Sequence, residues 1–163
     1  MKSWLFERML ATAIALPALS AAAWAGGTDD FGCSNATLKG EYAFGVTNLT
    51  IPQVVAGIKV FDGYGNLTQR DYIGNSTPVE FAPPGQERGT YTVNPDCTGS
   101  MVINLNVPGA PRPNGVIEIL FVISDGGRHI HEVVSQITPP FSSAPEPAQT
   151  SADDWKVASE QQQ

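Results

Sequence analysis

The chain has two histidines, His129 and His131, and they are the residues best suited to bind a transition metal. They stand two residues apart in a segment predicted to be a strand, so both side chains should project from the same face. Zinc or copper would need further ligands from neighbouring strands, and Glu132 falls on the opposite face. We therefore interpret them as exposed strand histidines and predict no metal site and no other cofactor.

Glu118 is the acidic residue whose surroundings most favour chemistry. It lies within the apolar run VIEILFVI at 116–123, which is typical of a strand covered on both faces. A buried carboxyl group must be paired or protonated, and a raised pKa would suit it to acid–base work or ligand binding. Arg70 or Tyr72 could be its partner across the fold. In the alternative interpretation, Glu118 faces solvent from a strand whose other face forms the core.

Other catalytic and ion-binding patterns are weak. The chain has no G-x-S-x-G segment, and two histidines leave a serine-based triad few choices. Asp62 and Asn66 could surround calcium, but a glycine-rich hairpin turn explains the same residues, and the further carboxylates of a calcium loop are missing. We predict no catalytic residues and leave open whether the protein is an enzyme.

The charge balance excludes two classes of partner. Acidic residues outnumber basic ones by 16 to 9 in the 163 residues, and the formal net charge is −7. The basic residues are scattered, whereas nucleic acid binding requires them in clusters. A polybasic stretch that would draw the chain to an anionic membrane surface is also missing.

Residues 1–25 have the pattern of a secretory signal peptide. Lys2 and Arg8 precede a largely apolar run at 9–19, and Ala-Trp-Ala follows at 23–25. The apolar run is too short for a comfortable bilayer span, and Pro17 interrupts it. We expect an exported protein, periplasmic or secreted, with no membrane span in the mature chain.

Cys33 and Cys97 are the two cysteines of the chain. An even count in an exported protein favours a disulfide, and only one intramolecular pairing exists. Two free thiols or a shared metal site are the alternatives. There is no C-x-x-C pair, which argues against a thioredoxin-like or zinc-ribbon protein.

The mature chain reads as a succession of short strands. Alternating or continuous apolar runs predict seven strands, separated by Gly- and Pro-rich turns and without helical patterns between them. They are expected at 42–47, 53–61, 67–73, 87–93, 101–107, 116–124 and 128–137, and the second has Val54, Ala56, Ile58 and Val60 on one face. Such a meander needs a sandwich or a closed barrel to hide its edges. We place one β domain at 26–138 and a disordered acidic tail at 139–163, in which Trp155 and Val157 could alternatively dock a short helix.

Three segments resemble a family of exported bacterial proteins, mostly of unassigned function, that share a small antiparallel barrel. They are Cys33 with LKGEYAF at 38–44, FDGYGNLT at 61–68, and GTYTVN at 89–94 with DCTG at 96–99. The hairpin ISDGGR at 123–128 is also similar, and G-x-Y at 40–42 is similar to the G-x-W that opens lipocalin barrels. The resemblance covers roughly 33–137. It implies an all-β, mainly antiparallel, up-and-down, lipocalin-like barrel of seven or eight strands, in which the tail could replace or cover a closing strand.

An eight-stranded barrel is large enough to hold one small ligand or to be filled by its own side chains. We predict a binding protein for a small apolar or amphipathic molecule, oriented by Glu118 or Arg70. The predicted lining residues are Tyr42, Phe44, Arg70, Tyr72, Tyr91, Glu118 and Phe121. One alternative is a structural or surface-interaction module with a solid core, whose loops at 75–86 and 108–115 make the contacts. Another is a cofactor-free isomerase or cyclase, which would need an inward acid such as Glu118.

Overall fold

The structure is a computed structural model that describes residues 32–48, 54–73, 87–106, 115–139, 142 and 144–157. The predicted signal peptide and the loop predicted at 75–86 lie outside these residues, as does the loop predicted at 108–115 apart from Gly115. No helix within the described ranges is long and apolar enough to cross a membrane.

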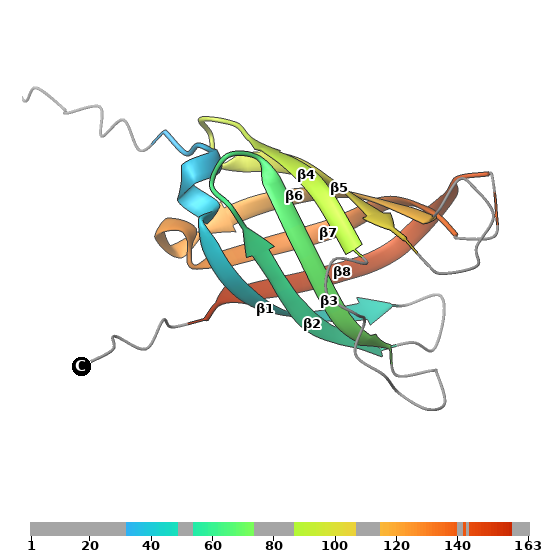
Figure 1. The fold of residues 1–163 in the computed structure, drawn as a ribbon. Coiled ribbons are helices and arrows are strands. Elements are labelled where there is room, and N and C mark those ends of the chain that lie inside the picture. Colours follow the sequence, from blue (N-terminus) through green and yellow to red (C-terminus); the bar gives the residue numbers. More distant parts are fainter. Residues whose placement is uncertain are drawn as a thin grey trace, which may run out of the picture. The chain divides into compact units, whose positions relative to one another are not determined.

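Eight antiparallel strands in the described part of the chain form a closed barrel (Figure 1). Each strand pairs with the next in sequence, and the last pairs with the first. The strands are β1 (Gly40–Asn48), β2 (Val54–Phe61), β3 (Asn66–Ile73), β4 (Glu87–Val93), β5 (Thr98–Leu105), β6 (Gly115–Ser124), β7 (His129–Thr138) and β8 (Glu146–Lys156). Two short 3-10 turns are η1 (Asn35–Leu38) and η2 (Asp125–Gly127). The predicted small all-β barrel is confirmed.

The closing strand corrects the predicted domain boundary. The disordered tail expected at 139–163 is wrong for 146–156, because β8 lies there between β1 and β7. A helix docked by Trp155 is wrong for the same reason. The inward side chains of β8 include Ala148, Ala152 and Asp154, which are small or polar, so the segment carries little apolar alternation. It is ordered because β1 and β7 would otherwise expose unpaired strand edges.

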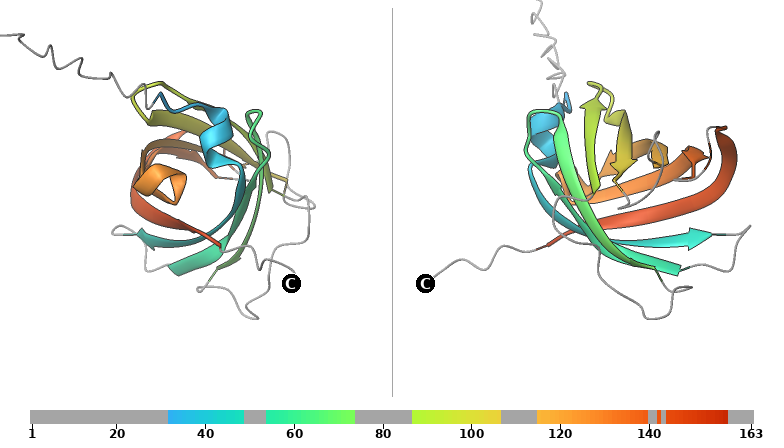
Figure 2. Two further views of the ribbon diagram at one scale, coloured as in Figure 1. Left: turned by 90° about the vertical axis from the view of Figure 1, so that its left-hand side faces the viewer. Right: turned by 45° about the vertical axis from the view of Figure 1, so that its right-hand side comes forward.

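One end of the barrel is filled by an apolar core and covered by the two turns. Leu38 of η1 is fully buried, and the ring of Phe61 lies between those of Tyr42 and Tyr91 in edge-on contacts, with ring centroids 5.3 and 5.0 Å apart. The Tyr42 hydroxyl donates to the Gly127 carbonyl in η2, and the Tyr91 hydroxyl donates to the Asn35 carbonyl in η1. Figure 2 (left) looks onto this end, with η1 in blue and η2 in orange. The aromatic residues therefore tie the two turns to the barrel.

The predicted disulfide between Cys33 and Cys97 is confirmed. It joins the segment before η1 to the turn between β4 and β5, where the Cys33 amide also donates to the Pro95 carbonyl at 3.1 Å. Cys97 has a φ of 65°, a left-handed conformation that is uncommon outside glycine. The turn and the disulfide together hold η1 over the end of the barrel.

Removing the disulfide should destabilise the folded protein chiefly by freeing the unfolded chain. The bond closes a loop with a sequence separation of 64, for which chain entropy gives an upper value of about 4 kcal/mol. We expect the variant C33A/C97A to lose up to this amount of unfolding free energy, measured by urea denaturation against the oxidised wild-type protein. An unchanged free energy of unfolding would contradict the expected role.

Candidate functional site

The barrel interior contains a cluster of charged side chains on three strands. Lys59 on β2, Glu132 on β7 and Asp154 on β8 are 1%, 2% and 0% exposed. Alternate residues of a strand share a face, so Lys59 points inward with Phe61, and Glu132 points inward with Ile130. Charged side chains are almost never fully buried without partners, which makes this cluster the feature of the fold that most needs an explanation.

Lys59 is the centre of the cluster. Its Nζ lies 2.5 Å from Glu132 Oε2, 3.0 Å from Asp154 Oδ2 and 3.3 Å from Asp154 Oδ1. The same ammonium lies 4.5 Å from the centre of the Phe44 ring, a cation–π contact. Gly57 leaves room for that ring, because a Cβ there would lie 2.6 Å from Phe44 Cε1. One lysine thus joins three strands and an aromatic face.

The protonation states within the cluster depend on one another. Burial by itself would lower the pKa of Lys59, but the charges and hydrogen bonds of Glu132 and Asp154 outweigh it and raise that pKa above its ordinary value. Burial raises the pKa of Asp154 to about 8, opposed by the Lys59 ammonium and reinforced by the Glu132 carboxylate. The partners of Lys59 therefore favour its ammonium form, whereas burial disfavours the ionised form of Asp154.

Two further buried acidic residues extend the polar side of the interior, called here the polar wall, onto β3 and β4. Asp71 on β3 and Glu87 on β4 are both buried, and Gln69, which is also on β3, donates its side-chain amide to Asp71 Oδ2 at 3.4 Å. Burial raises the pKa of Glu87 to about 7, with the Asp71 charge adding to it and a hydrogen bond from Gln69 opposing it. Burial also raises the pKa of Asp71, which the Lys59 charge opposes. Asp71 therefore couples electrostatically to Glu87 and to Lys59.

Two carboxyl oxygens of this wall have no hydrogen-bond partner among the described residues. They are Glu87 Oε2 and Glu132 Oε1, and both atoms are buried. An unpaired buried polar atom costs roughly 1–3 kcal/mol, and such atoms in native proteins call for a specific explanation. Both atoms therefore have an unused capacity to accept a hydrogen bond within the described structure.

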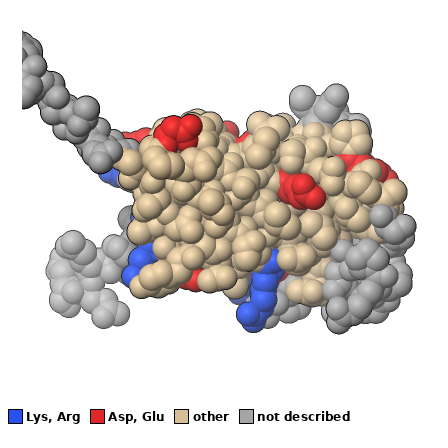
Figure 3. Space-filling model, turned by 90° about the horizontal axis from the view of Figure 1, so that it is seen from above, with Lys and Arg blue, Asp and Glu red and all other residues tan. Residues whose placement is uncertain are grey.

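The opposite side of the interior is apolar. In the described ranges, β5 and β6 contribute no charged side chain to the inside of the barrel. Their buried hydrophobic side chains are Met101, Ile103, Ile119, Phe121 and Ile123. Charges on the outer face shown in Figure 3 are scattered singly over a largely uncharged surface. The buried charges of β2, β7 and β8 thus share the interior with an apolar side formed by β5 and β6.

Four of the predicted lining residues are buried in the barrel. Phe44 contacts the charged cluster, whereas Tyr42, Tyr91 and Phe121 belong to the apolar core. Both tyrosine hydroxyls donate to backbone carbonyls of the turns. Burial raises the pKa of Tyr42 to about 12. Of these four residues, Phe44 is thus the one in contact with the charged cluster.

The expectation that Arg70, Tyr72 and Glu118 line the interior is corrected by the structure. Arg70 and Tyr72 alternate with the buried Asp71 and so lie on the outer face of β3, where Tyr72 is 48% exposed. Glu118 is exposed on β6 and accepts a hydrogen bond from Gln136 Nε2 at 3.2 Å. The isomerase hypothesis required an inward Glu118 and loses that support.

The predicted turn at Asp62 and Asn66 is a structural device. Asp62 Oδ1 accepts from the amides of Tyr64 and Asn66 at 2.7 and 3.0 Å, and Oδ2 accepts from Asn66 Nδ2 at 2.7 Å. These hydrogen bonds, those from Asn66 foremost, lower the pKa of Asp62. Both carboxylate oxygens are thus committed to the turn between β2 and β3, which supports the hairpin interpretation over calcium.

Sequence reasoning missed the charged residues of the interior. The second strand carries apolar residues on both of its faces. The face that the sequence pattern singled out as apolar is the outer one, where Val54, Ile58 and Val60 are 68%, 39% and 39% exposed. The residue that could have identified the inward face of β2 is Phe61. It lies on the same face as Lys59 and is the first residue of the sequence FDGYG, which forms the turn. Asp154 was missed because its strand was not expected.

Removing the central ammonium should destabilise the barrel strongly. We expect K59M to lose about 3–5 kcal/mol of unfolding free energy at pH 7, because it leaves buried carboxyl groups without their cation. The triple variant K59M/E132Q/D154N should recover most of this loss, since no uncompensated charge remains in the cluster. Urea denaturation measures both variants, and a K59M protein as stable as wild type would contradict the assignment.

Stability should also depend on pH through the buried acids. The pKa values of about 7 for Glu87 and about 8 for Asp154 mean that the folded protein binds more protons than the unfolded chain between about pH 4.5 and pH 8. The free energy of unfolding should therefore fall as the pH rises through this window. In E87Q the fall should be smaller, whereas the exposed-site control E41Q should follow wild type. Urea denaturation at pH 5, 6, 7 and 8 tests this, and equal slopes for wild type and E87Q would refute it.

Comparisons with protein-family models, curated proteins and solved structures found no match for this chain. The features that the structure establishes are an all-β closed barrel and a disulfide between Cys33 and Cys97. Any function of the interior must be inferred from its own chemistry.

Proposed function

We propose that this protein is an exported barrel that holds a small amphipathic molecule with a hydrogen-bond-donating, cationic head group such as an amine. The observation that carries the proposal is the pair of buried carboxyl oxygens, Glu87 Oε2 and Glu132 Oε1, that have no partner among the described residues. A donor head group would satisfy these atoms and remove the cost of leaving them unpaired.

The charge of the interior supports a cationic rather than an anionic head. Lys59 is already engaged by Glu132 and Asp154, so it offers little to an incoming anion. The four buried carboxyl groups exceed the single ammonium, and burial holds the pKa of three of them above its ordinary value. A bound cation would favour the ionised carboxylates and lower those pKa values.

The apolar side of the interior supports an amphipathic molecule rather than a bare cation. Ile103, Ile119 and the other buried side chains of β5 and β6 belong to the apolar core and make that side of the interior hydrophobic. Ligand sites of this kind combine a mostly apolar lining with a few polar groups that orient the ligand.

We also propose export and kinship with the exported barrel family that the sequence resembles. The Cys33–Cys97 disulfide supports an oxidising compartment. Two of the family-like segments lie at structural devices of the barrel, with FDGYGNLT at the turn between β2 and β3 and DCTG at the turn between β4 and β5.

A matched pair of fluorescent probes tests the cationic preference. Dansylcadaverine carries an amine, and dansyl-6-aminohexanoic acid has a similar chain that ends in a carboxylate. We expect saturable binding of the amine with enhanced dansyl emission, and binding of the acid at least tenfold weaker. E87Q should weaken binding of the amine without disturbing the Lys59 ion pair, and the outward-facing control E118Q should leave it unchanged.

Native mass spectrometry of protein purified from its own source tests the same proposal without a chosen probe. A retained small molecule with a basic group would support it. Protein that retains nothing and binds neither probe would instead favour the structural module with a solid core. Preference for the acidic probe would overturn the assignment of a cationic head group.

A further inference from the structure

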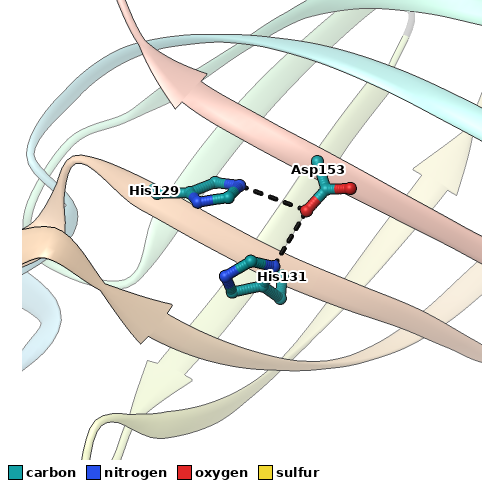
Figure 4. Close-up of side chains that lie close together, drawn as sticks. All are labelled: His129, His131 and Asp153. Carbon is teal, nitrogen blue, oxygen red and sulfur yellow. Dashed lines mark hydrogen bonds and ion pairs between the residues drawn. The ribbon is translucent and has the colours of Figure 1, made fainter.

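The outer face of the barrel carries a second cluster, separate from the interior. His129 and His131 on β7 share one face, as predicted, and Asp153 of β8 lies directly opposite His131 in the strand register. Figure 4 shows both rings turned toward the Asp153 carboxylate. We propose that His129, His131 and Asp153 bind a divalent transition-metal ion of the zinc class.

The ligand atoms are already close to the spacing that zinc requires. Asp153 Oδ1 lies 3.1 Å from His129 Nε2 and 2.9 Å from His131 Nδ1, and the three ligand atoms all lie within 4.8 Å of one another. Tetrahedral zinc with bonds of about 2.0–2.1 Å places its ligand atoms roughly 3.3 Å apart. Small side-chain movements therefore make room for the ion, and the backbone need not change.

Neighbouring side chains hold both imidazoles in the orientation that a metal needs. Ser124 Oγ lies 3.3 Å from His131 Nε2, so this nitrogen can donate its proton to the hydroxyl and leave Nδ1 as the metal ligand. The Trp155 indole stacks on the His129 ring, with centroids 3.6 Å apart and planes 16° from parallel. The two imidazoles are thus oriented by groups that are not themselves ligands.

The donor set and its exposure select the class of ion. Two imidazoles and one carboxylate suit zinc, copper or nickel, whereas calcium and magnesium prefer oxygen ligands alone. The side chains of His131 and Asp153 are 54% and 60% exposed, so an ion can reach them from solvent. The His129 side chain is only 11% exposed, so the prediction of two exposed histidines is wrong for His129, whose ring is covered by Trp155. Three protein ligands leave a fourth position for water or for a donor atom of another molecule.

Calorimetric titration with zinc chloride at pH 7.5 tests the proposal on the full-length, tag-free, chelator-treated protein. We expect one zinc ion per chain, no comparable heat with magnesium, and binding at least tenfold weaker in H131A and in D153N. S124A should weaken binding by about tenfold through loss of the supporting hydrogen bond. These exposed positions should tolerate substitution, and circular dichroism verifies that each variant is folded.

Two controls separate this site from the rest of the molecule. D125N removes a nearby exposed acid that is not a ligand, and E87Q removes an acid of the interior, so both should bind zinc like wild type. Because the chain has only two histidines, their side-chain nitrogen resonances can be resolved by NMR. Zinc should shift His129 Nε2 and His131 Nδ1 in the manner of metal-bound nitrogens.

The proposal is overturned if wild type shows no saturable zinc binding, or if zinc leaves both imidazoles unchanged. It is equally overturned if H131A and D153N bind as tightly as wild type, which would place the ion elsewhere. None of these results depends on what the barrel interior holds, so the proposed ligand binding stands or falls separately.

Discussion

The pairing of β8 with both β1 and β7 closes the barrel, and both candidate sites depend on it. Successive residues of a strand point to opposite faces, so Asp153 and Asp154 are directed outward and inward by one backbone. Asp154 meets Lys59 in the interior, and Asp153 meets the two histidines outside. A shift of β8 by one residue would exchange these faces, and one of the two clusters would lose its acid.

The interior of the barrel combines an apolar core with a cluster of buried charges. The core around Tyr42, Phe61 and Tyr91 fills the end covered by the turns and buries a contiguous apolar surface, which is the main favourable contribution to folding. The charged cluster makes no comparable contribution, because burying ions costs as much as their attraction returns, or more. Stability alone therefore does not account for the cluster, and recognition of a bound molecule is the role that we propose for it.

Several features followed directly from local patterns. Alternation around Met101 and Ile103 located a strand, and glycines and Asp62 located a hairpin turn. With two cysteines, a single intramolecular pairing was available, and the structure contains it. The charged interior could not be predicted from local patterns. Both faces of β2 carry apolar residues, and no local pattern indicates which face turns inward. The weakly patterned β8 was also hidden, since its order comes from its two neighbours.

By itself the sequence determined an all-β chain with one possible intramolecular cysteine pair and two histidines on one face of a strand. The strands and the histidine spacing depend on residues close in sequence, and two cysteines allow a single pairing. Tertiary structure decided which faces turn inward and which distant residues meet. Lys59, Glu132 and Asp154 come together only when the barrel closes, and so do the two histidines and Asp153. Closure is a long-range property of eight strands, and no local pattern specifies it.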